Sequence, residues 1–250
     1  VLTGVNIGSY GRDLVGHEAA GTVTLATMVA RLLEETTIPR LRLSSLEPWD
    51  VDERLLALFA DPRLCPHLHL PLQSGSDAVL RRMGRAMDVR DYRALVKQIR
   101  ARVGAITLST DLIVGFPGES LKDHEATLSL VEELALARLH VFRFSPRQRT
   151  PAALMDGQVP SQMAQVRARE LSACGRALAG TWHREHVGRV ARVLFESPAS
   201  RDGQRGWTGL TENYLRVWVP SEPGLGNQIR AVLCTSADDD GLEGTLLAEC

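Results

Sequence analysis

Cysteine is scarce in this chain of 250 residues, and its four cysteines follow no metal-binding spacing. Cys65, Cys174, Cys234 and Cys250 lie far apart, so the sequence holds neither a C-x-x-C pair nor the dense pattern of a disulfide-stabilised secreted domain. We interpret all four as reduced and mainly structural thiols.

Long apolar runs are absent as well. No stretch approaches the roughly 20 residues of a transmembrane helix, and no signal peptide is visible. We therefore expect a globular protein without a membrane partner and assign it to the cytoplasm. Because Val1 begins the chain inside an apolar run, we also expect the chain to be a fragment.

A large excess of one charge is missing too, since the formal net charge is -1, but the charges are unevenly distributed. Lys and Arg outnumber Asp and Glu in residues 81–102 and 138–184, whereas acids prevail after residue 186. The two basic stretches match either contact with a polyanion such as RNA or the solvated faces of ordinary helices. Both interpretations stay open at this point.

The stretch 105–119 organises the rest of the chain. It is apolar and rich in β-formers up to Val114, and Gly115-Phe116-Pro117-Gly118 then ends it abruptly. Ser120, with Asp123 three residues later, predicts the capped start of a helix. A strand, a tight turn and a capped helix place backbone N–H groups at one edge of a sheet, where α/β folds bind ligands.

Four further segments follow the same plan of strand, polar or glycine-rich turn, and helix. Helical stripes separate them, including one that starts near Asp88 as N-cap, and a second helix is predicted near residues 52–60. The alternation predicts an α/β fold with parallel strands, whose carboxyl ends face a single site in either a barrel or an open sheet. The predicted strands lie near residues 1–7, 41–43, 64–72, 105–114 and 139–145.

The pattern changes after residue 185. A long helix rich in Arg and Ala is predicted from Ser161 to about His183, and short β segments follow near 190–195, 214–219, 229–234 and 245–248. These segments predict a small antiparallel barrel. We therefore divide the chain into residues 1–185 and 186–250.

His67 and His69 point to the same face of one predicted strand, so a metal pair is conceivable. No third ligand is evident in the sequence. We therefore favour hydrogen-bonded or core histidines and predict no metal site held by this chain.

Five motifs, taken together, resemble the radical S-adenosylmethionine methylthiotransferases, and they occur in the family's order. The resemblance implies a partial (β/α) barrel of the radical SAM type for residues 1–185 and a TRAM-like RNA-binding β-barrel for residues 186–250. The motifs are L-T-G-V-N-I-G-S-Y-G (2–11), R-L-S-S-L-E-P (42–48), C-P-H-L-H-L-P-L-Q-S-G-S-D (65–77), T-D-L-I-V-G-F-P-G-E (110–119) and H-V-F-R-F-S-P-R (140–147).

The function that the resemblance implies is tRNA modification. The segments V-N-I-G-S-Y-G and S-S-L-E-P are most similar to sequences of the branch that methylthiolates threonylcarbamoyl-adenosine beside the anticodon. In this family a radical generated from S-adenosylmethionine at a 4Fe-4S cluster carries the difficult step. The alternatives are the branches that act on isopentenyl-adenosine in tRNA or on a ribosomal protein, and a non-catalytic RNA-binding fragment. The oligomeric state stays undefined.

Two departures from the family pattern stand out. The C-x-x-x-C-x-x-C loop and the second cysteine set that hold the family's clusters are absent from this chain, so we expect the isolated chain to be inactive. In addition, Arg149 stands where the resemblance leads us to expect a glycine before Thr150.

Two groups of site residues are expected from these motifs. The candidates for contact with S-adenosylmethionine are Asn6, Glu47, Gln73, Ser74, Asp111, Gly115 and Phe116, each of which is alternatively a turn former or cap. The candidates for contact with RNA are Arg147, Arg149, Arg167, Arg169, Trp207 and Tyr214, through guanidinium–phosphate pairing and stacking on bases. Core packing is the alternative for at least one of the aromatic residues, among which we also count Trp218.

Overall fold

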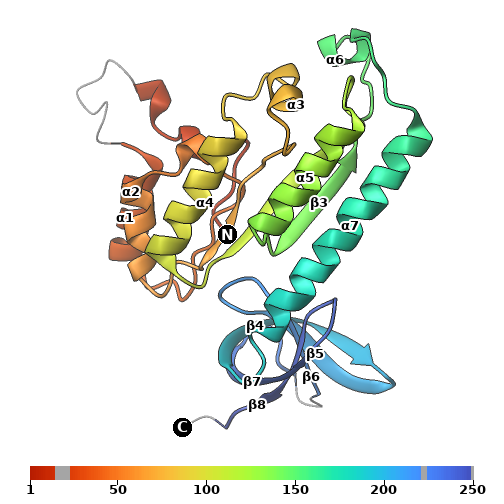
Figure 1. Cartoon of the computed structure of the whole chain (residues 1–250). Coiled ribbons are helices and arrows are strands. Elements are labelled where there is room, and N and C mark those ends of the chain that lie inside the picture. The colour runs from red at the N-terminus through yellow and green to blue at the C-terminus, as the bar shows by residue number, and fades with distance from the viewer. Residues whose placement is uncertain (15–22, 221–223, 249–250) are drawn as a thin grey trace.

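The computed structural model describes residues 1–14, 23–220 and 224–248, so Cys250 lies outside the described residues. Its first part is a parallel α/β body (Figure 1). The strands β1 (His67–His69), β2 (Thr107–Val114) and β3 (Arg138–Arg143) pair in parallel in that order. Parallel bridges join Leu2 to Leu43 and Ser45 to His69, which adds two further extended segments on the β1 side. The predicted parallel arrangement of five successive segments is confirmed.

Helices connect these segments, and none in the described part of the chain is both long and apolar enough to span a bilayer. The predicted caps are confirmed. The Ser120 hydroxyl accepts the Asp123 N–H while the Asp123 carboxylate accepts the Ser120 N–H, and Asp88 caps the next helix upstream. The α-helices are α1 (Leu25–Glu35), α2 (Glu53–Ala57), α3 (Asp77–Arg82), α4 (Val89–Val103), α5 (Leu121–Glu133), α6 (Pro151–Leu154) and α7 (Ser161–Arg184).

The two faces of the sheet differ in chemistry because successive side chains of a strand alternate between them. Leu68, Leu108 and Leu112 are fully buried and pack with helix residues such as Val96 in one apolar core. Most neighbouring residues on β1 and β2, among them His69, Ser109 and Asp111, are polar and face the other way. The helices therefore cover one face of the sheet, and the polar side chains lie on the opposite face.

The last part of the chain is a closed barrel with the strand order β4-β5-β6-β8-β7. The expectation of an entirely antiparallel barrel is wrong in one place, because β6 pairs with β8 in parallel. Trp218 is buried, but its neighbours Val217 and Val219, which point to the other face of β6, belong to the apolar core of the barrel instead. The strands are β4 (Val190–Arg201), β5 (Gln204–Leu210), β6 (Arg216–Pro220), β7 (Ile229–Ala237) and β8 (Leu242–Leu246).

β5, which contains Gly206 and Gly209, was not among the predicted β segments. In the structure these glycines allow close approach of neighbouring backbone. A Cβ at Gly206 would lie 2.3 Å from the Val219 carbonyl oxygen, and a Cβ at Gly209 would lie 2.3 Å from that of Leu194. Glycine inside a strand therefore serves the tight curvature of a small barrel here.

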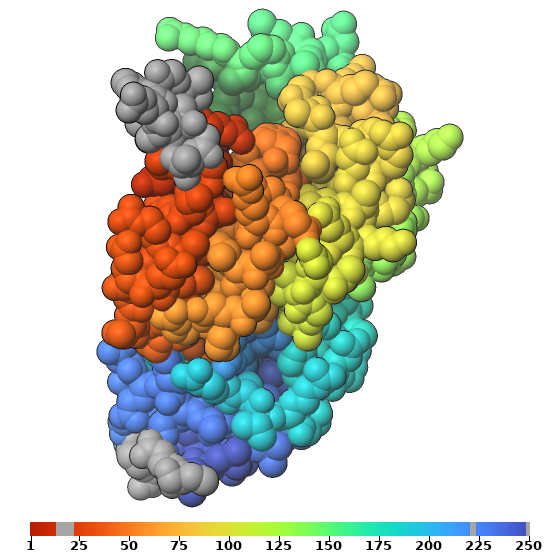
Figure 2. Space-filling view, turned by 90° about the vertical axis from the view of Figure 1, so that its left-hand side faces the viewer, coloured from red at the N-terminus to blue at the C-terminus, as the bar shows by residue number. Residues whose placement is uncertain are grey.

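The barrel packs against the amino ends of the parallel strands. The Trp182 indole N–H, near the end of α7, donates to the Thr107 hydroxyl at the start of β2 (3.0 Å). The Arg40 guanidinium donates to the Leu210 carbonyl of β5 (2.9 Å). Figures 1 and 2 show the barrel below the α/β body, and Figure 1 shows α7 running along β3 toward it. The barrel and the carboxyl ends of the strands thus lie at opposite ends of the molecule.

His186, at this junction, predicts a pH-dependent stability. Its Nδ1–H donates to the Trp182 carbonyl (2.8 Å), and its Nε2 accepts from the Asn213 amide (2.9 Å). Burial lowers the pKa of His186, so the unfolded chain binds a proton more readily than the folded chain does. This stabilising contribution is complete above the unfolded pKa of about 6.5 and declines as the pH falls below it.

Urea titrations at about pH 7.5 and about pH 5.5 measure this effect. Wild type is expected to lose more stability between the two pH values than His186→Gln, whose amide does not titrate in this range. Equal losses in the two proteins would exclude the assignment.

Candidate ligand site at the carboxyl edge of the sheet

The turns that follow the five segments share one edge of the sheet, because the carboxyl ends of parallel strands lie side by side. Asn6, Glu47, Gln73 and Gly115 each follow a different segment in this row. The hollows lined by described residues separate two of them. Asn6 lines one of about 620 Å³ with the first loop, and Gly115 lines another of about 540 Å³ with the end of β3 and the start of α7. The residues thus share one edge of the sheet, and whether they share one cofactor site stays a prediction.

Gln73 adopts a backbone conformation that favours glycine, with φ +73°. Its N–H donates to the Asp111 carbonyl (2.8 Å), and its own carbonyl accepts the Ile113 N–H (2.9 Å). These two bonds pin the strained residue against β2. Non-glycine residues held in this region occur preferentially at functional sites, because surrounding contacts have to maintain the strain.

The turn after β2 is fixed by a buried ion pair. Gly115 has φ +74°, and its N–H donates to the Glu119 carboxylate (3.0 Å). The Arg167 guanidinium of α7 donates to the other oxygen of that carboxylate (2.5 Å) and to the Glu119 carbonyl (3.1 Å). Burial raises the pKa of Glu119, and Arg167 counteracts that rise. The pair therefore fastens the glycine turn to α7.

The other residues expected at this edge have partners within the protein. Ser74 is buried, and its hydroxyl accepts the Ser76 N–H (3.2 Å). Glu47 forms an ion pair with Arg85 (2.5 Å). Phe116 is buried and packs edge to face on Phe144, with 5.1 Å between ring centroids. These three side chains shape the edge of the site.

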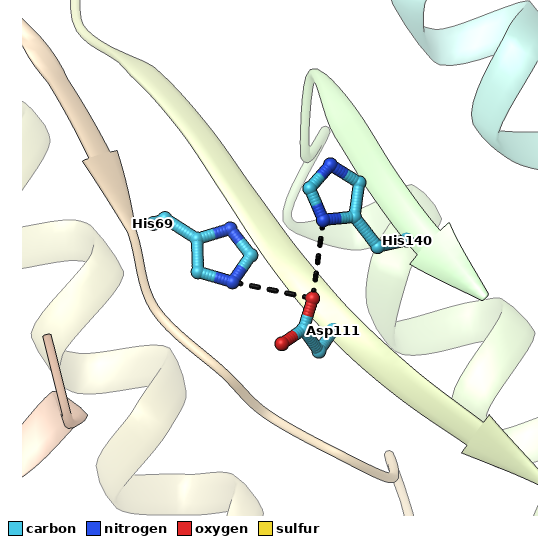
Figure 3. Close-up of side chains that lie close together, drawn as sticks. All are labelled: His69, Asp111 and His140. Atoms are coloured by element: carbon cyan, nitrogen blue, oxygen red, sulfur yellow. Dashed lines mark hydrogen bonds and ion pairs between the residues drawn. The ribbon is translucent and has the colours of Figure 1, made fainter. Parts of the chain in front are cut away.

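Asp111 does not lie at a strand end, because β2 continues to Val114. Its Oδ1 accepts from His69 Nε2 and from His140 Nδ1, each at 3.2 Å (Figure 3). Burial alone would raise the pKa of Asp111, but these two hydrogen bonds outweigh burial and hold that pKa well below its usual range. Asp111 therefore lies within β2 and not at its end, and its contact with S-adenosylmethionine stays a prediction.

A chain of hydrogen bonds continues from this group toward the barrel. The Ser109 hydroxyl lies 3.0 Å from His69 Nδ1 and 3.1 Å from His67 Nε2. Burial and the nearby Arg42 cation lower the pKa of His67 to about 3, so this ring is neutral. The expectation of hydrogen-bonded core histidines is confirmed for His67 and His69. His140 was quoted in a motif without a role, because nothing in the sequence indicates that β3 brings it to Asp111.

Three of the arginines expected to contact RNA are exposed: Arg147 and Arg149 after β3, and Arg169 on α7. The expectation for Arg167 is wrong, because its side chain is buried against Glu119. Tyr214 is not free to stack on a base either. Its ring lies 4.6 Å from that of His67 and 4.1 Å from the Arg42 guanidinium carbon, between the barrel and the sheet.

Trp207 stays a candidate for contact with RNA. It lies on β5 and is partly exposed, and it packs against the barrel core. The exposed arginines follow the carboxyl edge, whereas Trp207 belongs to the barrel at the other end of α7. A nucleic acid that touched both groups would have to extend along this helix, which is about 36 Å long.

Arg149 has φ +67°, the conformation for which a glycine was expected at this position. Replacing Arg149 with Gly is therefore expected to raise the free energy of unfolding by about 1 kcal/mol, because the left-handed region strains residues with a Cβ. The RNA contact expected from the sequence further predicts that the same change weakens binding of tRNA as a probe, since it removes an exposed cation.

Urea unfolding and tRNA titration measure the two opposed effects of Arg149→Gly, and Gln148→Gly is the matched control. Gln148 is not among the residues with positive φ. The control is therefore expected to lose stability and to keep its tRNA affinity. A loss of stability in Arg149→Gly comparable to that of the control would contradict the strain argument.

The cysteines in the described part of the chain do not match an iron–sulfur cluster. Cys65 precedes β1, Cys174 lies in α7 and Cys234 lies in β7, so no two share a loop. Burial raises the pKa of Cys65 and Cys234, and burial together with Glu132 raises the pKa of Cys174 to about 11. Iron–sulfur clusters are held by thiolates. A raised pKa disfavours the thiolate form, so these three cysteines are poor cluster ligands.

Comparisons with known proteins agree on one family. Residues 19–131 match the model of the radical SAM superfamily. The chain is 39% identical over 246 residues to a threonylcarbamoyladenosine tRNA methylthiotransferase, MtaB, of Thermotoga maritima, covering 97% of this chain and 53% of that protein. It is 36% identical over 249 residues to a tRNA-2-methylthio-N(6)-dimethylallyladenosine synthase of Dictyoglomus thermophilum, covering 99% of this chain and 55% of that protein.

A solved structure supports the fold. Coproporphyrinogen III oxidase (HemN) from Escherichia coli, described as a radical SAM enzyme, superposes with a TM-score of 0.50 at 16% identity, covering 75% of this chain and 51% of that chain. This likeness concerns the fold alone. The chain spans about half the length of the curated relatives that it matches.

Proposed function

The chain belongs to the radical S-adenosylmethionine methylthiotransferases, and from this premise we propose that it supplies the cofactor-binding sheet and RNA contacts of an enzyme that methylthiolates threonylcarbamoyl-adenosine next to the anticodon of tRNA. The observation that supports this proposal most directly is that the five segments with the motifs end on one edge of a parallel sheet. The named relatives modify adenosines of this kind in tRNA. A cytoplasmic location follows from a tRNA substrate.

The hydrogen-bonding groups at the carboxyl edge suit S-adenosylmethionine. The cofactor carries a carboxylate, an ammonium group and ribose hydroxyls. The exposed Asn6 and the half-buried Gln73 offer amides at the ends of two segments that flank the 41–45 segment in the same row. Gly115, whose turn packs closely on Ala164 of α7, is proposed to contact the cofactor through its backbone, and Ser74, Glu47 and Phe116 are proposed to complete the same edge. When bound, the cofactor supplies the radical chemistry that an unactivated C–H bond requires.

The residues of this chain are proposed to bind and orient the cofactor and the tRNA. Glu119 and Arg167 hold the Gly115 turn in place, so the backbone beside the cofactor is fixed before binding and loses little entropy on binding. Arg147, Arg149 and Arg169 meet tRNA phosphates near the same edge, and Trp207 offers a base-stacking surface on the barrel. Residues 186–250 are proposed as a TRAM-like RNA-binding barrel, and residues 1–185 as the radical SAM part.

Deleting the gene and measuring the modified nucleosides of total tRNA by mass spectrometry tests the proposal. We expect loss of the methylthio group from threonylcarbamoyl-adenosine, with dimethylallyl-adenosine unaffected. The reverse pattern would assign the protein to the dimethylallyl-adenosine branch, as in several relatives. If both nucleosides keep their methylthio groups, the tRNA proposal is overturned, and the alternatives are a ribosomal-protein substrate or a binding role without catalysis.

A further inference from the structure

The polar face of the sheet holds a compact group of three potential metal ligands, one from each of three adjacent strands. His69 lies on β1, Asp111 on β2 and His140 on β3 (Figure 3). His69 Nε2, Asp111 Oδ1 and His140 Nδ1 all lie within 4.8 Å of one another. We propose that these three atoms bind one divalent transition-metal ion, with Zn²⁺ as the expected ion.

The distances suit ligands of one ion. Both imidazole nitrogens converge on the same oxygen of Asp111, each at 3.2 Å. A charge-assisted N–H···O⁻ hydrogen bond is usually shorter, at about 2.7–2.9 Å. Two ligand atoms that are each about 2.1 Å from a tetrahedral zinc lie about 3.4 Å apart. The two Asp111 separations are thus close to those of a coordinated carboxylate.

The strand pairing holds the ligands in place. Asp111 and His140 are direct partners in the β2–β3 register, and Ser109, two residues before Asp111, is the partner of His69. Strands fix side chains more precisely than loops do. The alternation along β2 also puts Ser109 and Asp111 on the same face. Little reorganisation is therefore needed, apart from a small movement of one imidazole toward the other.

A supporting shell is present around His69. Metal-bound histidines usually donate their second ring N–H to a polar partner, which fixes the tautomer. Ser109 Oγ lies 3.0 Å from His69 Nδ1 and is placed to accept that proton, and its own hydroxyl can donate to His67 Nε2 at 3.1 Å. With the ion bound, this arrangement holds the His69 proton on Nδ1 and leaves the Nε2 lone pair for the metal, whereas without the ion Nε2–H donates to Asp111.

The donor set and its exposure indicate which ion binds and how it is reached. Two imidazoles and one carboxylate suit zinc and related transition metals, whereas Mg²⁺ and Ca²⁺ prefer sites built from oxygen. The His69 side chain is 10% exposed, but those of Asp111 and His140 are 27% and 39% exposed. The ion therefore has an entry path and keeps a fourth position for an oxygen ligand from solvent.

Zinc titration of the chelator-treated chain by calorimetry, with metal analysis after dialysis, tests the site. Wild type is expected to bind one Zn²⁺ per chain, and its melting temperature should rise on binding. Asp111→Asn and His140→Gln are expected to weaken binding by more than about 100-fold, and Ser109→Ala by about 10–100-fold. Cys174→Ser, which removes a half-buried thiol elsewhere, should bind like wild type.

The variants also distinguish a metal site from a group of side chains that is held by hydrogen bonds alone. Asp111→Asn keeps an oxygen that accepts hydrogen bonds, so a purely hydrogen-bonded role predicts equal zinc affinity in wild type and variant. That result, or less than about half an equivalent of zinc in wild type, overturns the proposal. So does a Co²⁺ spectrum with thiolate charge-transfer bands. His140→Gln alters the most exposed ligand, so it decides the question if Asp111→Asn fails to fold.

Discussion

Replacing Arg167 with Ala lowers the free energy of unfolding by about 3–5 kcal/mol, whereas replacing Arg169, on the same helix, changes it by less than about 0.5 kcal/mol. The difference follows from burial. Arg167 and Glu119 are both nearly inaccessible and are paired at 2.5 Å, while Arg169 is exposed. Without Arg167, the Glu119 carboxylate stays buried, and among the described residues it keeps the Gly115 N–H as its one hydrogen-bond donor.

A second variant separates charge from packing at this position. Glu119→Gln combined with Arg167→Met removes both charges, and the Gln amide oxygen keeps an acceptor for Gly115. Replacing both partners of a buried ion pair usually costs much less than replacing one. The double variant is therefore expected to recover most of the stability lost in Arg167→Ala, as measured by urea unfolding. A loss as large as that of the single variant would contradict the uncompensated-charge argument.

Replacing Gly115 with Ala is expected to cost about 2–4 kcal/mol and to displace the turn at the carboxyl edge. Two effects combine. The backbone at φ +74° strains any residue with a Cβ, and an added Cβ would lie 2.7 Å from the Ala164 Cβ of α7. Weaker binding of S-adenosylmethionine should accompany the loss, because the turn forms part of the proposed site.

The steric part of this cost can be isolated with Ala164→Gly. This change removes the methyl group that a Cβ at residue 115 would meet, at a cost of about 1 kcal/mol in helix propensity. The double variant is expected to be more stable than the sum of the two single changes by about 1–3 kcal/mol. Additive effects within about 0.5 kcal/mol would mean that backbone strain alone explains the cost.

Local patterns were enough to predict much of the fold. The apolar run before Gly115 and the Ser120–Asp123 pair correctly placed β2 and the start of α5, because strand alternation and helix capping depend on neighbours within a few residues. β5 escaped prediction because Gly206 and Gly209 serve contacts with strands far along the chain. The parallel pairing of β6 with β8 is likewise a long-range property.

The site shows the same limit. The strand ends were found from motifs, but the sequence could not separate Arg167 from Arg169, since only the position of Glu119 across the fold buries one of them. The sequence also could not show that the Tyr214 ring packs on His67, or that His140 forms a hydrogen bond with Asp111. Which polar side chains are already paired depends on tertiary contacts that no local spacing encodes.

Equilibrium binding of S-adenosylmethionine to the complete gene product, with its iron–sulfur cluster assembled, tests most directly whether the carboxyl edge is the cofactor site. Gln73→Ala and Asn6→Ala are each expected to raise the Kd at least about tenfold, because each removes a hydrogen-bonding amide. Gln204→Ala, at the exposed start of β5 in the barrel, should leave the Kd unchanged. Wild-type affinity in both edge variants would contradict the account.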